Sequence, residues 1–573
     1  MYRPGRDETA YYSMEIAISD AIPTFSGGLG VLAGDHVRSA ADRGIRLVAV
    51  TLLYRFGFFR QEVGADGAQV ELPVQWEPSR LLEELPERVH VPLSDRHVVV
   101  RPWRHVVTGV GGHQVPIYLL DTDLDENPPA DRAIADRLYL GDRAHRLSQE
   151  VILGIGGPLA LHALGHRTIR THHMNEGHAS LVPLGVLANR DPAGARGRVP
   201  DTLPEPTKSD LEWVRDRCVF TTHTPVPAGH DRFDPAVAGA TLGLNPLRAL
   251  EEHGLLEADG TLNMTLLGMS LSRFVNAVSV RHRGVTRQMF PSAAVESITN
   301  GVHSSTWAGE PLASLFDRRI PDWRAASSQL RYVAALSLSE LRVAHNQAKR
   351  DLCDEAERRS GVTLDPQMFT IGIARRFAGY KRNDLLLSDP RRLADLATRG
   401  GPLQVLVSGK AHPQDGLGKD LLRRVVMGAA SPPPGVRIVF LPDYDMSLAR
   451  LMCAGSDVWL NTPEPPNEAS GTSGMKAALN GVPSVSTLDG WWLEGHIEGV
   501  TGWAIGSTSE GPQGASEHAE ALYRLLGDVV IPMYYRDPDR FDAVRRNAIA
   551  LNASFFSGHR MVDEYARRAY GDS

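Results

Sequence analysis

The segment Asp457–Gly481 reads DVWLNTPEPPNEASGTSGMKAALNG. It begins with an apolar stretch typical of a buried strand, continues as a loop rich in Pro and Gly, and ends in an Ala- and Leu-rich stretch that favours a helix. Three earlier segments repeat this strand–loop–helix order: MFTIGIARRFAGYKRNDLLL (368–387), PLQVLVSGKAHP (402–413) and VRIVFLPDYDMSLARLMCAG (436–455). Such alternation predicts an α/β fold, in which a parallel sheet carries helices on both faces.

The rest of the chain indicates a second domain of the same class. At 573 residues the chain is too long for a single core. In its first half, 46–57 and 115–124 are apolar enough for strands and 148–165 for a buried helix, whereas the Pro-, Gly- and charge-rich segment 188–210 predicts a surface loop. We therefore expect two Rossmann-like domains, residues 1–310 and 311–573, connected through the polar segment 303–323.

Composition excludes several classes of function. With 42% hydrophobic and 23% charged residues, the chain has the balance of an ordinary soluble protein. A net charge of -7 gives no electrostatic case for nucleic acid or an anionic membrane, and the longest apolar run is too short to span a bilayer. The N-terminus lacks the apolar core of a signal peptide, and Cys218, Cys353 and Cys453 are too widely spaced for a disulfide framework. These features predict a cytoplasmic protein without nucleic-acid or membrane partners.

Lysine is rare in this chain, which makes each lysine informative. Only six of the 61 basic residues are lysine: Lys208, Lys349, Lys381, Lys410, Lys419 and Lys476. Arginine can replace a surface charge, but it cannot act as a titratable amine or form a Schiff base. We interpret Lys208, Lys349 and Lys419 as surface charges and treat the other three as candidates for chemistry.

Two segments of the second half have the character of anion sites. Arg375, Arg376, Lys381 and Arg382 crowd the end of one predicted strand, where an anion would relieve their mutual repulsion. The predicted helix that contains Lys476 is approached by glycines, and a helix N-terminus also attracts anions. Two such sites in one domain suggest two phosphates. Neither segment is a nucleoside-triphosphatase P-loop, because Ala rather than Ser or Thr follows Lys476.

A Gly-rich segment of the first half is a third candidate for ligand contacts. SGGLGVLAGDH (26–36) matches the dinucleotide fingerprint formally, but the predicted strand after it, 46–57, offers no acidic residue for a ribose. We interpret Gly27, Gly28 and Leu29 instead as a loop whose backbone N–H groups approach an anion or a sugar.

The segment HHMNEGHAS (172–180) gathers His172, His173, Glu176 and His178. A metal site would need these side chains to converge, but the cluster follows a predicted strand in which neighbouring residues face opposite ways. We therefore expect no metal, and we interpret the segment as the polar lining of a sugar cleft.

Eight segments occur in a fixed order along the chain: SGGLGVLAGDH (26–36), YRFGFFRQ (54–61), RLSQE (146–150), HMNEGHAS (173–180), FTTHTPVPAGHDRF (220–233), ITNGVHSSTW (298–307), RRFAGYKR (375–382) and NEASGTSGMKAALNGVPSVSTLDG (467–490). In this order they resemble the α-glucan phosphorylase family, whose members act on glycogen, starch or maltodextrin, in its short bacterial and archaeal form. The likeness covers nearly the whole chain.

The resemblance implies a fold and a reaction. The fold is two Rossmann-like domains facing across a deep cleft (GT-B glycosyltransferase architecture), with the last helix packing back on the N-terminal domain. The cofactor is pyridoxal 5'-phosphate, held as a Schiff base by Lys476, and its phosphate works as the acid/base partner of the substrate phosphate. The reaction is phosphorolysis, with retention, of a terminal α-1,4-glucosyl bond of an α-glucan or maltooligosaccharide by inorganic phosphate, which gives glucose 1-phosphate. A homodimer is the expected assembly.

The resemblance also implies roles for individual residues. The catalytic residues are Lys476, Arg376, Lys381 and His223, and Arg376 and Lys381 hold the substrate phosphate together with backbone N–H groups near Gly28. The cofactor contacts are Lys476, Arg375, Tyr444, Thr472, Gly471 and Gly28. The sugar contacts are Asn300, Glu468, Ser470, Gly471 and Tyr380, to which the candidates Glu176, His178, Gly27 and Leu29 are added.

The chain departs from longer family members at positions that concern control rather than catalysis. Residues 377–379 are Phe-Ala-Gly where longer members read Ile-His-Glu, and Asp445 stands where they have Arg. The chain also begins close to the first of the eight segments. We therefore expect neither allosteric control nor binding to stored glycogen.

Two alternatives remain open. A nucleotide-sugar glycosyltransferase of the same architecture would use Arg376 and Lys381 for a diphosphate and would not need Lys476. A catalytically inactive glucan-binding protein is the other, and the complete set of catalytic residues argues against it.

Overall fold

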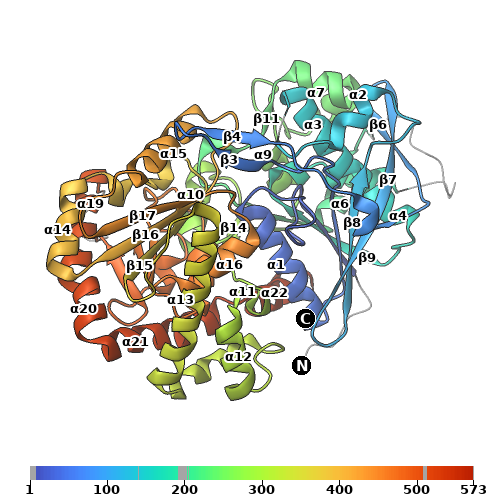
Figure 1. Ribbon diagram of the computed structural model, residues 1–573. Coiled ribbons are helices and arrows are strands. Elements are labelled where there is room, and N and C mark those ends of the chain that lie inside the picture. The colour runs from blue at the N-terminus through green and yellow to red at the C-terminus, as the bar shows by residue number, and fades with distance from the viewer. Residues whose placement is uncertain (1–7, 140, 191–202, 204, 508–512, 572–573) are drawn as a thin grey trace. The chain divides into compact units, whose positions relative to one another are not determined.

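The computed structural model describes residues 8–139, 141–190, 203, 205–507 and 513–571 (Figure 1). Contacts within the chain divide it into two compact units. Unit 1 contains Met1–Phe58, Pro73–Ile298 and Met561–Ser573, and unit 2 contains Phe59–Leu72 and Thr299–Arg560. Most of the predicted surface loop 188–210 lies outside the described residues.

The sheet of unit 2 has the strand order of a doubly wound fold. Its six strands are β15 (Phe369–Ala374), β16 (Leu403–Ser408), β17 (Val436–Leu441), β18 (Val458–Asn461), β19 (Ser484–Thr487) and β20 (Gly502–Ile505). They lie in the order β17-β16-β15-β18-β19-β20, and each neighbouring pair is parallel. The order reverses between β15 and β18. Doubly wound sheets bind ligands at this reversal, beyond the carboxyl ends of the strands.

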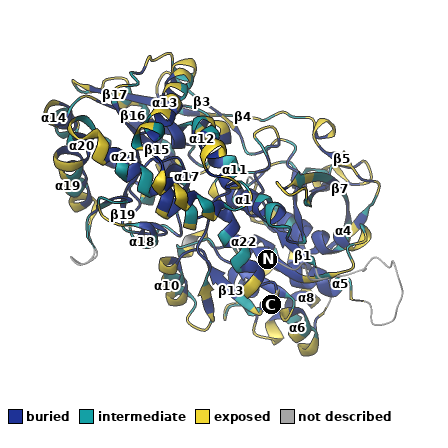
Figure 2. Cartoon of the chain, turned by 90° about the horizontal axis from the view of Figure 1, so that it is seen from below, coloured by how far each residue is buried: buried dark blue, intermediate teal, exposed yellow. Residues whose placement is uncertain are grey.

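Both faces of this sheet are buried, which explains why its strands are continuous apolar runs. Successive residues of β16 point to opposite faces, so that Val405 and Val407 join one apolar cluster and Leu406 joins another. Helices cover both faces. The first face is covered by helices that include α14 (Pro390–Gly400) and α15 (Gly416–Ala429), and the second by helices that include α13 (Leu338–Ser360) and α16 (Met446–Gly455). In Figure 2 the strands are dark blue and therefore buried, whereas α14 carries exposed residues. The predicted α/β fold is confirmed for this unit.

The sheet of unit 1 repeats the same design. Its parallel strands are β1 (Glu8–Tyr12), β2 (Leu47–Leu52), β8 (Gln114–Asp121), β9 (Ile169–Asn175), β10 (Cys218–Thr221), β13 (Phe274–Ala277) and β14 (Val295–Ser297). They lie in the order β14-β13-β10-β9-β1-β2-β8, which reverses between β1 and β9. Helix α1 (Gly28–Arg43) connects β1 to β2, and an antiparallel strand, β7 (Arg96–Thr108), extends the sheet beside β8. The strands predicted within 46–57 and 115–124 are confirmed as β2 and β8.

The predicted buried helix 148–165 is confirmed as a helical stretch that runs from α3 (Arg143–Val151) to α4 (Gly157–Ala163). At the C-terminal end of the chain, helix α22 (Gly558–Arg568) leads into the last residues of unit 1. There the Tyr570 hydroxyl lies 2.9 Å from His36 Nε2 and 2.8 Å from His173 Nδ1, deep in the core of that unit.

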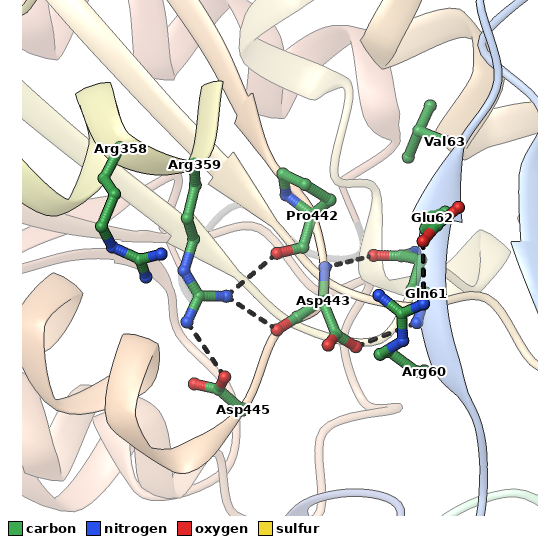
Figure 3. Close-up of a pocket in the computed structure, with 9 residues that line it drawn as sticks. All are labelled: Arg60, Gln61, Glu62, Val63, Arg358, Arg359, Pro442, Asp443 and Asp445. Carbon is green, nitrogen blue, oxygen red and sulfur yellow. Dashed lines mark hydrogen bonds and ion pairs between the residues drawn. The ribbon is translucent and has the colours of Figure 1, made fainter. Parts of the chain in front are cut away.

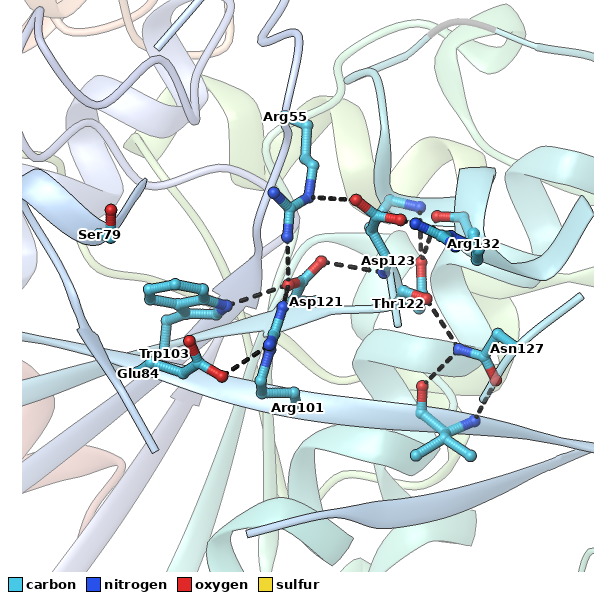
Figure 4. Close-up of polar contacts among 12 residues, drawn as sticks. Arg55, Ser79, Glu84, Arg101, Trp103, Asp121, Thr122, Asp123, Asn127 and Arg132 are labelled. Atoms are coloured by element: carbon cyan, nitrogen blue, oxygen red, sulfur yellow. Dashed lines mark hydrogen bonds and ion pairs between the residues drawn. The ribbon is translucent and has the colours of Figure 1, made fainter. Parts of the chain in front are cut away.

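The chain leaves unit 1 after Phe58, and a charged cluster fixes the residues just before this exit (Figure 4). The Arg55 guanidinium donates to Asp121 Oδ2 at 2.7 Å and pairs with Asp123 at 3.1 Å. Asp121 also accepts from Arg101 at 2.7 Å and from Trp103 Nε1 at 3.0 Å. The buried Asp121 carboxylate is thus fully paired, and it anchors the segment that precedes the exit.

Cys218, Cys353 and Cys453 are buried free thiols, as expected from their spacing. Within the described ranges, no helix has both the length and the apolar composition needed to cross a membrane.

Candidate active site

The two strands at the reversal point of unit 2 both end in segments that were predicted to bind ligands. Arg375 follows β15 directly and is 9% exposed. Its Nη2 donates to Leu460 O at the end of β18, and its Nη1 donates to Lys381 O at 3.3 Å. Burial lowers the pKa of Arg375 to about 10. Its Nε is buried and has no hydrogen-bond partner among the described residues, so one donor remains available.

The other three cations of this segment differ in their partners. The Arg376 side chain is exposed and forms no ion pair within the described part of the chain. Lys381 forms an ion pair with Glu468, which joins the loop after β15 to the loop after β18. Arg382 instead donates to the carbonyls of Thr462 and Pro463, both at 2.8 Å. Arg382 is therefore a structural cation that shapes the loop after β18, contrary to its grouping with the anion-binding cations.

Lys476 lies on α17 (Thr472–Leu479). Two glycines of the same motif, Gly471 and Gly474, are required for different physical reasons. Gly471, the N-cap, has φ 86°, a conformation that glycine adopts without strain. At Gly474 a Cβ would lie 2.8 Å from the Trp491 ring, so that glycine permits packing of that ring. Gly474 therefore leaves no room for a ligand, because the Trp491 ring fills that space.

The Lys476 amine is buried and held in a defined place. The residue is 7% exposed, and Nζ lies 3.8 Å from the centroid of the Trp307 ring. Asn480 fixes this pair, since its Nδ2 donates to Trp307 O at 2.8 Å and to Lys476 O at 2.9 Å. Its Oδ1 accepts from Gly309 N at 2.7 Å. Sequence reasoning missed Trp307 and Asn480, although both belong to the quoted motifs.

Tyr444 and Lys476 share a neighbour in Cys453. Burial raises the pKa of the Tyr444 hydroxyl well above its usual value, and the Cys453 thiol raises it further. Burial likewise raises the pKa of Cys453 to about 12, although the charge of Lys476 opposes this shift. At neutral pH both groups therefore keep their protons, and the amine has no thiolate beside it.

Three of the predicted contact residues carry buried polar atoms that lack a partner among the described residues: Arg375 Nε, Asn300 Oδ1 and Ser470 Oγ. A buried polar atom without a hydrogen bond costs about 1–3 kcal/mol, so these three atoms are available to a ligand that enters the candidate site. A buried amine, a phenol, an arginine with an unused donor and a helix N-terminus together suit a ligand that carries both a carbonyl and an anionic group.

In unit 1 the glycines of the segment 26–36 differ in how closely other atoms pack around them. Gly27 and Gly28, at the start of α1, have no non-adjacent described atom within 4 Å of a Cβ placed on them, so ligand atoms can approach there. At Gly30 a Cβ would lie 2.7 Å from both Glu15 Oε2 and Phe25 Cβ, so this glycine is required by packing. Glu15 accepts from the N–H of Gly27 at 3.3 Å, which holds the loop in place. Leu29 lies in the first turn of α1 and is partly exposed.

His223 and Glu176 meet at the carboxyl ends of β10 and β9. Glu176 Oε2 accepts from His223 N at 2.7 Å and from the Thr224 hydroxyl at 2.9 Å, and Glu176 has φ 85°, which is rare for a residue with a side chain. His223 Nε2 lies 2.7 Å from Asn175 Oδ1. Burial lowers the pKa of His223 to about 3, so that its ring is neutral and can exchange a hydrogen bond with a hydroxyl group.

The remaining histidines of the segment 172–180 lie in the core. His172 Nδ1 lies 3.0 Å from the Tyr12 hydroxyl, whereas His173 contacts Tyr570 and faces the other side of the sheet. The expected divergence of these neighbours is confirmed. His178 Nε2 accepts from Met14 N at 2.9 Å, and burial lowers its pKa to about 3.

Lys349 is not the surface charge that its sequence context suggested. It is 1% exposed, and its Nζ lies 2.6 Å from Asp457 Oδ2 and 3.1 Å from the Tyr534 hydroxyl. The prediction was wrong because the partner, Asp457, is 108 residues away in the sequence. Lys419, by contrast, is partly exposed and pairs with Glu71 at 2.8 Å.

Comparison with known proteins places this chain in one family. A family model described as carbohydrate phosphorylase matches residues 244–499. A maltodextrin phosphorylase from Thermococcus litoralis is 39% identical over 99% of this chain and 71% of its own length. A glycogen phosphorylase from Mycobacterium tuberculosis is 39% identical over 98% and 70%, and one from Aquifex aeolicus is 33% identical over 98% and 85%. The resemblance that the eight segments suggested is confirmed, and the chain belongs to the carbohydrate phosphorylase family of enzymes.

Proposed function

We propose that this chain is a pyridoxal 5'-phosphate-dependent α-glucan phosphorylase. It cleaves terminal α-1,4-glucosyl units from an α-glucan or maltooligosaccharide with inorganic phosphate, retains the anomeric configuration and releases glucose 1-phosphate. The observation that carries the proposal is the buried Lys476 amine, held over Trp307 on a helix that begins at the reversal point of the sheet. A lysine buried at this place suits covalent attachment of an aldehyde.

The residues around Lys476 fit the rest of this cofactor. Arg375, with its unused Nε donor, and Thr472, in the first turn of α17, would hold the cofactor phosphate. Tyr444 would pack beside the ring. When bound, the cofactor supplies a phosphate that acts as the acid/base partner of the substrate phosphate.

The substrate phosphate would bind to Arg376 and Lys381. Arg376 is exposed and has no carboxylate partner in the described ranges, so that an incoming anion meets an uncompensated charge. Lys381 is already paired with Glu468, and this pair fixes the directions of a phosphate-binding amine and a sugar-binding carboxylate at the same time. These cations would stabilise the negative charge of the substrate phosphate, and the cofactor phosphate would be its acid/base partner. The proposed reaction therefore needs no carboxylate nucleophile.

The glucosyl unit would be held by neutral groups. Asn300 Oδ1 and Ser470 Oγ have no partners among the described residues and would bond to sugar hydroxyls, with Gly471 and Tyr380 beside them. The neutral His223 would exchange a hydrogen bond with a further hydroxyl, and Gly28 and Leu29 would offer backbone N–H groups beside Gly27, whose own N–H donates to Glu15. Glu176 supports His223 through its backbone N–H.

Covalent trapping tests the cofactor assignment. Borohydride reduction of the purified protein, followed by peptide mapping, should place a pyridoxyl group on Lys476. A group on Lys410, or none on any lysine, would contradict the proposal.

The reaction itself is tested in both directions. Glucose 1-phosphate should extend a maltooligosaccharide, and inorganic phosphate should shorten it. Protein reconstituted with pyridoxal, which lacks the phosphate, should fold but remain inactive, because the partner of the substrate phosphate is then missing. Efficient transfer from a nucleoside diphosphate glucose by the Lys476→Ala variant would instead favour the nucleotide-sugar transferase. Absence of any transfer would favour a glucan-binding protein.

The proposal includes a cytoplasmic location and a homodimer. The reduced, buried Cys218, Cys353 and Cys453 suit a reducing compartment. Light scattering of the purified protein measures the assembly state, and a monomer would contradict this part alone.

A further inference from the structure

A hairpin from the first part of the chain is built into unit 2. It consists of β3 (Arg60–Val63) and β4 (Gln69–Leu72), which pair antiparallel so that Gln61 lies opposite Glu71. Its base is fixed by Lys410 Nζ, which donates to Phe59 O at 3.0 Å. Its far strand is fixed by the ion pair between Lys419 and Glu71 at 2.8 Å. The hairpin therefore lies against the segments that follow β16. These segments are far away in the sequence, since 351 positions separate Lys410 from Phe59.

Gln61 is the residue through which this hairpin reaches the site. It is 2% exposed, and each polar atom of its side chain has a partner. Its Nε2 donates to Gly409 O at 3.0 Å and to Gln69 Oε1 at 2.9 Å. Its Oε1 accepts from Asp443 N at 2.9 Å, and its backbone N donates to Asp443 Oδ1 at 2.9 Å. One glutamine thus joins the loop after β16 to the loop after β17.

The turn after β17 depends on these bonds. Asp443 has φ 56°, a left-handed conformation that costs an ordinary residue about 1–2 kcal/mol. Figure 3 shows the turn held from two sides, by Gln61 and by Arg359. Arg359 donates to Pro442 O at 3.2 Å and to Asp443 O at 3.0 Å, and it pairs with Asp445 at 3.0 Å. The residue inside this turn is Tyr444, the proposed neighbour of the cofactor.

The loop after β16 touches the proposed phosphate-binding segment. Gly409 has φ 143°, and a Cβ placed on it would lie 2.0 Å from Arg375 O, so the two backbones are in direct contact. Arg375 N donates to Ser408 O at 3.3 Å, and Phe377 N donates to Lys410 O at 3.0 Å. A shift of Gly409 would therefore carry the backbone of Arg375 with it.

We propose that Gln61 is a positioning residue for phosphorolysis. By bonding to Gly409 and Asp443 together, it sets the spacing between the backbone that carries Arg375 and Arg376 and the turn that carries Tyr444. These residues lie on the phosphate side and the ring side of the proposed cofactor site. The inference rests on the proposed function and adds a residue that touches neither cofactor nor substrate.

The test compares Gln61→Met with Lys419→Met. The first variant keeps the size of the side chain but removes all three side-chain hydrogen bonds. The second breaks the ion pair with Glu71 and leaves the bonds of Gln61 to Gly409 and Asp443 in place. Gln61→Met should raise KM for inorganic phosphate by roughly ten- to a hundredfold, the scale expected for a misplacement of about 1 Å, and should leave KM for maltooligosaccharide unchanged. It should also shift the phosphorus resonance of the bound cofactor. Lys419→Met should match the native protein in all three.

A second variant covers the case in which Gln61→Met does not fold. Gln61→Glu keeps an acceptor for Asp443 N but loses both donors, and its carboxylate faces Asp443 and Lys410, with Glu71 and Arg359 beyond them. Protonation restores one donor towards Gly409 O. The ratio of its phosphate KM to that of the native protein should therefore fall as the pH is lowered, a signature that loss of packing alone would not give.

The outcomes separate this inference from the function on which it rests. A native protein without cofactor or phosphorolysis would overturn both. An active native protein whose Gln61 variants match Lys419→Met in phosphate KM and phosphorus resonance would overturn the positioning role alone. A pH-independent ratio for Gln61→Glu would do the same.

Discussion

The two ends of strand β18 differ in how their charged groups are paired. At its amino end, Asp457 is buried and completely paired: Lys349 Nζ lies at 2.6 Å, Thr370 N at 2.8 Å, His345 Nε2 at 3.0 Å and Arg545 Nη2 at 2.5 Å. These partners hold the pKa of Asp457 far below its usual value, although burial opposes them. Such a network serves the stability of the fold.

At its carboxyl end, the same strand leads into a region of incomplete pairing. Arg375 Nε and Ser470 Oγ are buried and have no partners among the described residues, and Arg376 is exposed without a counter-ion there. Buried, paired polar groups such as Asp457 are therefore by themselves no sign of a binding site. Unpaired buried atoms also occur at the amino end, on Ser456 and His345, so the contrast lies in the charges. Asp457 meets Lys349 and Arg545, whereas Arg376 meets no carboxylate among the described residues.

Replacement of Lys476, on the helix that follows β18, should reduce activity more than any other change. Lys476→Arg keeps a positive charge beside Trp307 but cannot attach an aldehyde, so phosphorolysis should fall by roughly a thousandfold or more. The free energy of unfolding of the cofactor-free protein should change little. Steady-state rates and urea titrations measure the two quantities, and a variant with near-native turnover would refute the role of Lys476.

The lysine at the amino end should show the reverse. Lys349→Met leaves Asp457 buried with one partner fewer and should lower the free energy of unfolding by about 3–5 kcal/mol. Activity per folded molecule should persist, because the network does not touch the site. The exposed Lys208→Met is the control and should change stability by less than about 0.5 kcal/mol. Equal stability of the two variants in urea would remove the contrast.

The third effect tests the unpaired cation. Arg376→Ala should lower phosphorolysis by about a hundredfold, the scale for loss of one charge-stabilising donor, while the cofactor stays bound. Stability should be unchanged, since Arg376 makes no ion pair in the described structure. The exposed Arg391→Ala is a matched control. If both variants keep native turnover at saturating phosphate, Arg376 is only a surface charge.

The free energy of unfolding should also depend on pH through His345, a partner of Asp457 at the amino end of β18. Burial lowers the pKa of His345 to about 4, whereas an unfolded histidine titrates near pH 6.5. The unfolded state therefore binds the proton first, so the contribution of His345 is complete above about pH 6.5 and is lost as the pH falls through about 4. His345→Gln should remove about 3 kcal/mol of this pH dependence relative to the native protein. Urea titrations at several pH values, with the exposed His90→Gln as control, check the difference.

The smallest effect compares two serines of one motif. Ser473 Oγ accepts from Trp459 Nε1 at 3.1 Å, so Ser473→Ala should cost about 1–2 kcal/mol of unfolding free energy. Ser470→Ala loses no hydrogen bond in this structure and should leave stability unchanged, but it should lower kcat/KM for the glucan about five- to tenfold. The opposite pattern would show that Ser470, not Ser473, supports the fold.

Much of the fold follows from local pattern. Strands that are buried on both faces are continuous apolar runs in the sequence. The strand at 403–408 could therefore be predicted within the segment 402–413. Arg375 and Lys476 stood out because ligand-binding loops follow strands in such folds. The motifs did not reveal Asn480 or Gln61, whose roles depend on partners brought together by folding.

The strand–loop–helix order, the family and the candidate lysine could be predicted from the amino-acid sequence, because backbone periodicity and motif order are local properties of the chain. What each polar group does could not be predicted, because it depends on contacts between distant residues. Lys349 and Lys476 are the same residue type, but the first meets Asp457, 108 residues away, and the second meets an aromatic ring. Gly471 has a positive φ that glycine adopts without strain, whereas a side chain at Gly474 would clash with the Trp491 ring. The burial, partners and pKa of a side chain arise from contacts that only the folded chain creates.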